Sequence, residues 1–264
     1  MKGGVGSPGN YSEYNVKDCF LDSFFYSGFK SKPFKSNYIL KGSTIWRTVD
    51  LENKQNKLLL STDKKCEQIS LIEIIKFGLF DKKLNAFYSD NFSEAEKTVM
   101  SSKQLSLTLS YKDSSEFVSF DSNGNETKNL VVEKRYLIAK DIVNFLIKED
   151  WIINSYSGQL EKFIIAIAPL VRDKRTDKAV PLFWLYYSEW EGLFNAFIAK
   201  NYLSDQKITY KDVFEKNYFS SQISKEINLF DRPIKSVHRG QDSYLESEII
   251  KEKIKNFESD LFQN

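Results

Sequence analysis

The sequence predicts an α+β fold: a mixed, mostly antiparallel sheet with flanking helices, an extended N-terminal arm and a helical C-terminal region. Three observations support this class. They are two hairpin patterns in the middle of the chain, helical spacing of apolar residues near its end, and an aromatic-rich start without a period. We expect residues 1–40 to form an aromatic arm with a disordered tip. Residues 41–264 are expected to form a single α+β domain that ends in a long amphipathic helix.

The arm is rich in aromatic side chains but has neither helical nor strand periodicity. Residues 1–10 are rich in Gly, Ser and Pro, which is typical of a mobile segment. A dense aromatic group follows at Phe24, Phe25, Tyr26 and Phe29. Two interpretations stay open: the arm covers its own core, or it docks on a neighbouring subunit, since aromatics are enriched at interface centres. Under the second interpretation these four residues are candidate partner-binding residues.

Two hairpins are expected in the middle of the chain. In the first, Asn123-Gly124 separates the strands Glu116–Phe120 and Asn129–Val132, which is a strong hairpin signal. The second hairpin pairs two longer strands, Phe145–Ser155 and Lys162–Leu170. Residues 163–167 are apolar without interruption, so this hairpin is expected at the centre of the sheet. Further strands are predicted at Leu84–Tyr88, Leu105–Tyr111 and Pro181–Tyr187.

Apolar spacing and capping residues predict the helices. The expected segments are Ile69–Phe80, a short helix from Ser93, Glu189–Lys200, a segment capped by Thr209 through Lys216, and one capped by Ser220 or Ser221 through Ile227. A last helix runs from Asp242 or Ser243 to about Phe262. Its predicted apolar stripe consists of Leu245, Ile249, Ile254, Phe257 and Leu261.

Charge and composition exclude several classes of protein. The formal net charge is +2, so a dedicated nucleic-acid binder is not expected. No apolar stretch of about 18 residues exists, so no bilayer span is expected. Residues 1–9 lack the apolar segment of a signal peptide, which leaves a cytoplasmic protein or a mature exported chain. Cys19 and Cys66 allow one disulfide without demanding it.

Catalytic patterns are scarce in this chain. His238 is the single histidine, and there is no Gly-x-Ser-x-Gly motif. One histidine and two cysteines are too few for a structural zinc site, so neither a metal nor a cofactor is expected. Glu149 and Asp150 are adjacent on a predicted strand and therefore point to opposite faces. We expect a structural and interaction protein, with a hydrolase that has an unrecognised cleft as the alternative.

Blocks of sequence from Trp46 onward carry a resemblance. They are Trp46-Arg47-Thr48-Val49-Asp50-Leu51, Lys148-Glu149-Asp150-Trp151, Ile167-Ala168-Pro169-Leu170, Pro181-Leu182-Phe183-Trp184, Phe219 through Lys225-Glu226 to Asp231-Arg232, and Gly240 to Lys251. In this order they resemble the GldN/PorN family, the ring protein of the type IX secretion and gliding apparatus of Bacteroidota. The resemblance covers roughly residues 44–262. Departures occur at Asn154, Trp190 and Phe262, and residues 101–134 match nothing in the pattern.

The resemblance implies a non-enzymatic ring subunit in the periplasm, associated with the inner face of the outer membrane. The implied partners are an outer-membrane ring lipoprotein of the GldK/PorK type, neighbouring copies of the chain, and the periplasmic region of a GldM/PorM-type motor subunit. On this basis the chain is a mature one whose signal peptide is absent. A ring of identical subunits needs two different patches that meet, and the arm and the last helix are the candidates.

The matched residues also have structural roles that can be predicted. Trp151 and Trp184 lie on expected strands, so we expect both to pack in the core. Strand alternation places Lys148 and Asp150 on one face, and Glu149 and Trp151 on the other. We expect a buried or half-buried ion pair between this strand and Arg47 or Arg232, which would fix the strand register. Asp231-Arg232-Pro233 is expected to turn the chain toward the last helix.

Overall fold

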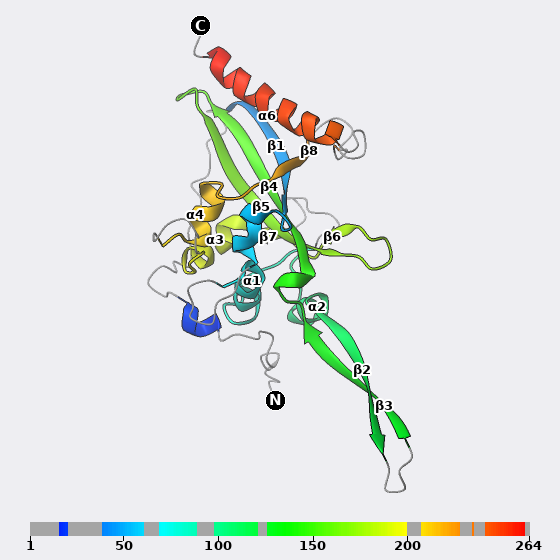
Figure 1. The fold of residues 1–264 in the computed structure, drawn as a ribbon. Coiled ribbons are helices and arrows are strands. Elements are labelled where there is room, and N and C mark those ends of the chain that lie inside the picture. The colour runs from blue at the N-terminus through cyan, green and yellow to red at the C-terminus, as the bar shows by residue number, and fades with distance from the viewer. Residues whose placement is uncertain are drawn as a thin grey trace.

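The computed structural model describes residues 16–20, 39–60, 69–88, 98–120, 126–199, 207–227, 234 and 241–261. Within these ranges an antiparallel sheet forms the centre of the molecule, with strand order β6-β5-β4-β1-β8 and with β7 paired to β5 (Figure 1). The strands are β1 Ile39–Asp50, β4 Ile142–Asn154, β5 Leu160–Arg172, β6 Ala179–Pro181, β7 Leu185–Tyr186 and β8 Gln222–Glu226. The α+β class predicted from the sequence is therefore confirmed.

Strands β4 and β5 form the predicted central hairpin. Each has 13 residues, and the register runs from Ile142 opposite Val171 to Ile153 opposite Leu160. Consecutive residues Ala166 to Leu170 are buried, because helices cover one face of the sheet and aromatic side chains cover part of the other. The turn uses Gly158, whose φ of 68° lies in the left-handed region that glycine adopts without strain.

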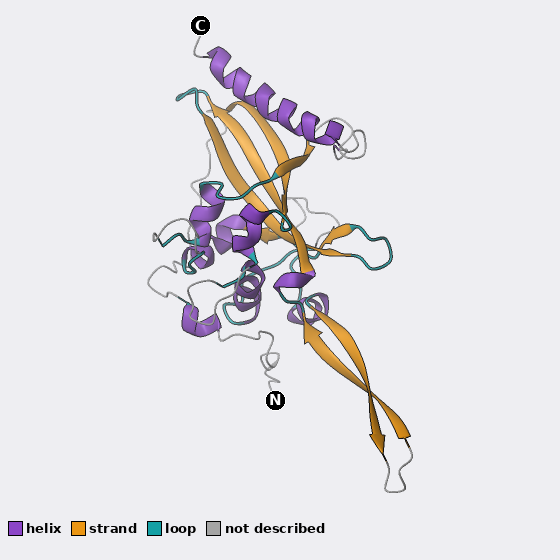
Figure 2. Cartoon of the chain, in the orientation of Figure 1, coloured by secondary structure: helices purple, strands orange, loops and turns teal. Residues whose placement is uncertain are grey.

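Helices cover one face of the sheet in two groups (Figure 2). α1 Leu71–Phe80, α3 Tyr187–Asn195 and α4 Tyr210–Glu215 bury apolar residues together with Val49, Phe145, Ile147 and Ile167 of the sheet. α6 Gln241–Leu261 lies over the other end of the sheet, where Ile250 joins Ile45, Trp151 and Ile223. Among the described residues, short 3-10 helices also lie at Val16–Cys19, Lys54–Leu59 and Ala139–Asp141.

Helix α1 is buried at every position, although it carries two charged residues. The Lys76 ammonium lies 2.6 Å from the Glu73 carboxylate and donates a hydrogen bond to the Leu137 carbonyl. A buried charge is tolerated only when it is paired and hydrogen-bonded. The ion pair therefore lets the helix predicted for Ile69–Phe80 run through the middle of the core.

A second hairpin stands apart from the main sheet. β2 Ser110–Phe120 and β3 Glu126–Tyr136 pair only with each other and project away from the body of the molecule (Figure 1). The register places Glu116 opposite Leu130, in agreement with the predicted pairing. The strands are longer than predicted and reach back to the helix α2 Ser102–Thr108.

The strand predicted for Leu105–Tyr111 is wrong, because most of it belongs to α2. Ser101 and Gln104 form a reciprocal capping box: the Ser101 side chain accepts from the Gln104 N–H, and the Gln104 side chain accepts from the Ser101 N–H. Leu105 and Leu109 are buried four residues apart, whereas Leu107 is exposed. The spacing of the leucines is therefore compatible with a helix as well as with a strand, and the capping box at Ser101 favours the helix.

The helix predicted from Ser220 or Ser221 to Ile227 is also wrong, since this segment is strand β8. Ile223 is buried, and the segment pairs with the free edge of β1, from Ile45 opposite Glu226 to Thr48 opposite Gln222. Tertiary pairing outweighs the local helix signal here. The strand predicted for Pro181–Tyr187 is interrupted, and at Leu84–Tyr88 only Phe87 makes bridges, with Val99 and Trp184.

The last helix is confirmed, but the stripe predicted for it is wrong at both of its described positions. Leu245 and Ile249 are 57% and 42% exposed, whereas Ser243, Ser247 and Ile250 are buried. The Ser247 hydroxyl accepts a hydrogen bond from the Ile223 N–H of β8. Small serines let the helix approach the strand closely, so packing selected a face that hydrophobicity alone does not indicate. The side chains of Ile254, Phe257 and Leu261 lie outside the described set.

The described part of the N-terminal arm, residues 16–20, contacts the main core of the same chain. Val16 is buried in the main core, and the Phe20 ring lies 5.4 Å from the Phe77 ring of α1. This segment therefore packs on its own chain. The start of the short helix predicted from Ser93 and most of the predicted arm, residues 1–15 and 21–38, lie outside the described residues.

Close packing at Gly78 of α1 gives a test of the core. A Cβ placed there would lie 2.4 Å from a ring carbon of Trp190 and 2.6 Å from a methyl carbon of Leu193. Alanine gains about 1 kcal/mol of helix propensity, but overpacking against a fully buried indole costs about 1–3 kcal/mol. We expect Gly78→Ala to lower the free energy of unfolding in a urea titration. An unchanged or higher midpoint would contradict the packing described here.

Candidate functional site: a buried polar cluster beneath exposed faces

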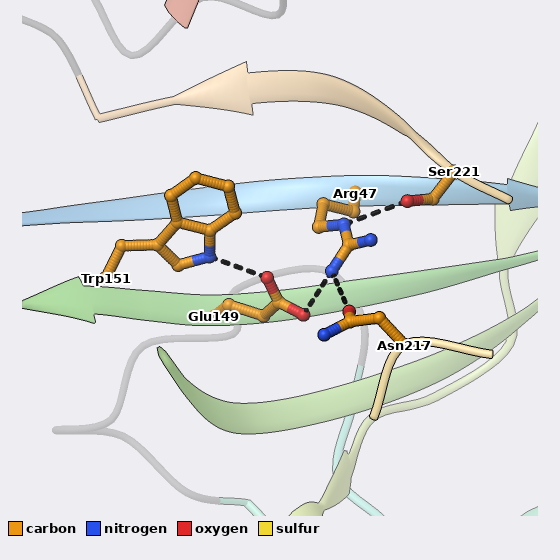
Figure 3. Close-up of polar contacts among 5 residues, drawn as sticks. All are labelled: Arg47, Glu149, Trp151, Asn217 and Ser221. Atoms are coloured by element: carbon orange, nitrogen blue, oxygen red, sulfur yellow. Dashed lines mark hydrogen bonds and ion pairs between the residues drawn. The ribbon is translucent and has the colours of Figure 1, made fainter. Parts of the chain in front are cut away.

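The predicted ion pair exists, and its partners are Arg47 of β1 and Glu149 of β4. Arg47 Nη1 donates to Glu149 Oε1 at 2.9 Å (Figure 3). The other carboxylate oxygen, Oε2, accepts from the Trp151 indole Nε1–H at 2.7 Å. Glu149 and Trp151 share one face of β4, as alternation predicted. The buried carboxylate thus has a donor on each oxygen, which offsets the cost of taking it out of water.

Two residues after helix α4 complete the cluster around the guanidinium. Arg47 Nη1 also donates to Asn217 Oδ1 at 2.5 Å, and Arg47 Nε donates to Ser221 Oγ at 2.9 Å. Asn217 has a φ of 54°, and asparagine is one of the residues that tolerate this left-handed conformation after a helix. The end of α4 therefore directs an amide oxygen toward Arg47.

The polar cluster lies between the two apolar groups that cover this face of the sheet. The Arg47 guanidinium lies 5.0 Å from the Phe219 ring, which belongs to the group around α1, α3 and α4. Trp151 belongs to the group under α6, and the Lys162 ammonium lies 4.2 Å from its ring. The cluster therefore joins β1, β4, the end of α4 and the start of β8 into one unit.

The opposite face of the sheet carries the other matched residues. The Trp46 ring lies 4.4 Å from the Lys225 ammonium and 5.6 Å from that of Lys148. The Thr44 hydroxyl donates to the Asp150 carboxylate at 2.5 Å, also across β1 and β4. Lys148 and Asp150 thus share this face, as predicted. These contacts couple neighbouring strands and fix their register.

The remaining predicted site residues divide into three groups. Phe183 and Trp184 are buried, and Pro169 lies opposite Phe145 in the sheet. Asp50 ends β1, where its carboxylate accepts from the Glu52 N–H, and on β8 the Glu226 carboxylate accepts from the Ser43 hydroxyl. The described ranges leave out a third group, which consists of Phe24, Phe25, Tyr26, Phe29, Asp231 and Arg232.

Sequence reasoning missed several polar residues that hold the framework together. The Asn56 amide donates to the carbonyls of Asp50 and Ser220, and its oxygen accepts from the Ser220 N–H. The Tyr210 hydroxyl donates to the Ile69 carbonyl. Asn217 and Ser221 were missed in the same way. Each of these residues has at least one hydrogen-bond partner more than 100 residues away, so no local pattern could indicate the pairing.

Acidic side chains approach each other around Lys211, which bears on the hydrolase alternative. The Lys211 ammonium lies 2.5 Å from Glu191 and 3.7 Å from Glu215. Burial is the largest cause of a raised pKa at Glu215. The Lys211 ammonium opposes this shift, and the nearby Glu191 carboxylate adds to it. The lysine between the two acids joins α3 to α4 and offsets one of their two charges, so this arrangement does not present a free pair of carboxylates to a substrate.

The described side chains contain no group of three or more His, Cys, Asp or Glu that could hold a metal ion. His238 lies outside the described residues. Within those residues, none of the helices combines the length and the apolar character that crossing a bilayer requires.

Removing Glu149 should be costly because it leaves Arg47 charged and buried. Loss of one partner of a buried pair typically costs about 3–5 kcal/mol, whereas replacing both partners with apolar residues costs much less. We expect Glu149→Leu to destabilise the chain by this amount, and R47M/E149L to recover part of the loss. Urea unfolding followed by tryptophan fluorescence measures both. If the loss in free energy of unfolding of R47M/E149L equals the sum of the losses of Arg47→Met and Glu149→Leu, the two residues are not coupled.

Comparison with known proteins agrees with the resemblance noted from the sequence blocks. No curated protein sequence matches the chain. The family model described as gliding motility associated protein GldN matches residues 35–263, which include both hairpins, the Arg47–Glu149 pair and α6. The chain therefore belongs to the GldN family and is a component of gliding motility and type IX secretion.

Proposed function

We propose that the chain is a non-enzymatic structural subunit of a periplasmic ring in the type IX secretion and gliding machinery. One observation carries this proposal. A body braced by buried ion pairs presents exposed apolar side chains on two separate elements, the β2–β3 hairpin and α6. Exposed apolar patches on a soluble framework mark interaction sites. Two different patches on one subunit are what a ring of identical copies requires.

The proposed partners are those that the resemblance to the GldN/PorN family implies. They are an outer-membrane ring lipoprotein of the GldK/PorK type, neighbouring copies of the chain, and the periplasmic region of a GldM/PorM-type motor subunit. The arm hypothesis is kept as part of this proposal: Phe24, Phe25, Tyr26 and Phe29 contact a partner.

The state of Cys19 supports a location in the periplasm, at the inner face of the outer membrane. Cys19 is disulfide-bonded, and Cys66 is the other cysteine of the chain. Structural disulfides persist in oxidising compartments such as the periplasm and are rare in the cytosol. Between the two locations left open by the sequence, the disulfide favours an exported chain.

The disulfide should contribute measurably to stability. A native disulfide typically contributes about 2–4 kcal/mol. We expect dithiothreitol to lower the melting temperature of the wild-type chain and to leave that of the C19A/C66A variant unchanged. Thermal unfolding by circular dichroism with and without reductant makes the comparison. Equal melting temperatures of the wild-type chain in both conditions would remove this support for an oxidising compartment.

Binding of the lipoprotein is the decisive test of the proposed function. We expect the purified chain and the soluble part of a GldK/PorK-type lipoprotein to elute together in size-exclusion chromatography at micromolar concentration. Absence of a complex would overturn the scaffold proposal.

Serine substitutions test the arm more cleanly than a deletion does, because a deletion also removes the buried Val16 and the bonded Cys19. We expect serine at Phe24, Phe25, Tyr26 and Phe29 to weaken the complex at least about tenfold, as loss of an aromatic anchor does. Serine at Tyr11 and Tyr14 is the matched control. Full binding by the fourfold variant would sink the arm hypothesis alone.

A further inference from the structure

One face of the β2–β3 hairpin is uncovered beyond its base, where Ser110 and Tyr136 of the same face are half-buried. Register and alternation place the following described residues on it, and all are exposed: Lys112, Ser114, Glu116, Val118, Glu126, Lys128, Leu130, Val132 and Lys134. Its centre is apolar, since Val118, Leu130 and Val132 are 48%, 63% and 53% exposed. A two-stranded hairpin is at best marginally stable alone, so such a face gains most from being covered.

The two faces of the hairpin differ in kind. On the other face, Arg135 pairs with Asp113 at 3.1 Å and with Glu133 at 3.6 Å, so its charges are satisfied within the hairpin. On the apolar face, lysines lie at the base of the hairpin. The Lys134 ammonium remains exposed although it donates to the Ser106 hydroxyl. This face therefore has apolar residues around Glu116, a pair of lysines at its base, and a small surplus of positive charge, since three lysines outnumber Glu116 and Glu126.

The outward face of α6 has the complementary character. Leu245 and Ile249 lie on the side of the helix opposite the buried Ser243, Ser247 and Ile250, and the exposed Tyr244 is next to them in sequence. Helical spacing places three acids, Asp242, Glu248 and Glu252, and one lysine, Lys253, around the two aliphatic residues. Lys251 pairs with Glu248 at 2.7 Å, so the acids remain in excess on this face. This face is an apolar centre with an acidic rim.

These two faces cannot meet within one molecule. The hairpin projects from one end of the subunit, and α6 lies at the opposite end (Figure 1). Their lengths agree: α6 has 21 residues and spans about 32 Å, while strands of 11 residues span about 36 Å. A helix laid along the hairpin would bring the apolar residues and lysines of the hairpin onto the acid-rimmed face of α6.

We propose that the exposed face of the β2–β3 hairpin docks on the outward face of α6 of a second copy of this chain. This inference rests on the proposed ring function and names the contact between neighbouring copies. Because the two patches differ, the interface is heterologous, and repetition of one rotation closes a ring or extends a filament. The contact gives a role to residues 101–134, which had no counterpart in the sequence blocks.

The size of the interface sets how strong each contact is. A face about 36 Å long and roughly 10 Å wide buries on the order of 350 Å² per copy, well below the roughly 800 Å² per partner of a standard interface. A single contact is therefore weak, and closure of a ring adds avidity that a pair of copies lacks. Self-association should depend on concentration and should weaken with added salt, because lysines meet acids.

Complementation between two variants of the full chain tests the contact. In L130T/V132E the hairpin is defective and α6 is intact. In L245K/I249K the opposite holds. All four positions are exposed, so neither change disturbs the core. We expect the wild-type chain to self-associate at up to about 100 µM, and each variant to lose at least about tenfold in affinity. An equimolar mixture should form a one-to-one heterodimer, because one intact hairpin meets one intact α6.

Sedimentation velocity measures the association state of each variant. The matched control is Tyr156→Ser, at the strongly exposed tip of the β4–β5 turn, which should associate as the wild type does. Three results would each overturn the proposal: a monomeric wild type, undiminished association of L245K/I249K, or a mixture that stays monomeric. The second result would indicate contact between hairpins. If a variant melts below the wild type, Lys112→Glu and Glu252→Lys replace it in the same scheme. If the chain still binds the lipoprotein while these self-association tests fail, only the contact between the hairpin and α6 is overturned, and the scaffold function stands.

Discussion

The buried ion pair between Arg47 and Glu149 is the interaction on which the rest of the structure depends. It crosses the two central strands, and its remaining hydrogen bonds reach Trp151 on β4, Asn217 after α4 and Ser221 before β8. A charge in this position is tolerated only while every partner is in place. The pair therefore forms only when the register of the sheet and the position of α4 are both correct. This makes the central part of the molecule, to which the β2–β3 hairpin and α6 are attached, more rigid.

Rigidity of the body and exposure of its ends are connected. Lys76 with Glu73 inside α1, and Lys211 with Glu191 between α3 and α4, add further ion pairs to the same framework. Charges are thus used within the described residues to join elements of the chain. The hairpin and α6 instead keep apolar side chains in solvent, so they are the elements with free energy to gain from a partner. This division suits a component that is assembled through its ends.

Local chemistry predicted much of this fold. The turn residues Asn123-Gly124 identified the first hairpin, two long apolar strands identified the second, and Thr209 identified the start of α4 as its cap. Alternation on β4 correctly separated Glu149 and Trp151 from Lys148 and Asp150. Prediction failed where two patterns competed. The leucines from 105 to 109 fit either period until the capping box of Ser101 is considered, and β8 is a strand because the edge of β1 is available to it.

By itself, the sequence determined the fold class, the two hairpins, the membership of the GldN family and the presence of an acid on β4 that needs a basic partner. Only the tertiary structure decided that this partner is Arg47, that Asn217 and Ser221 complete it, and that α6 turns Leu245 and Ile249 outward. The physical reason is the range of the forces. Turns and caps act within a few residues and are written locally, whereas buried pairs and helix faces depend on which distant surface is close enough to pack.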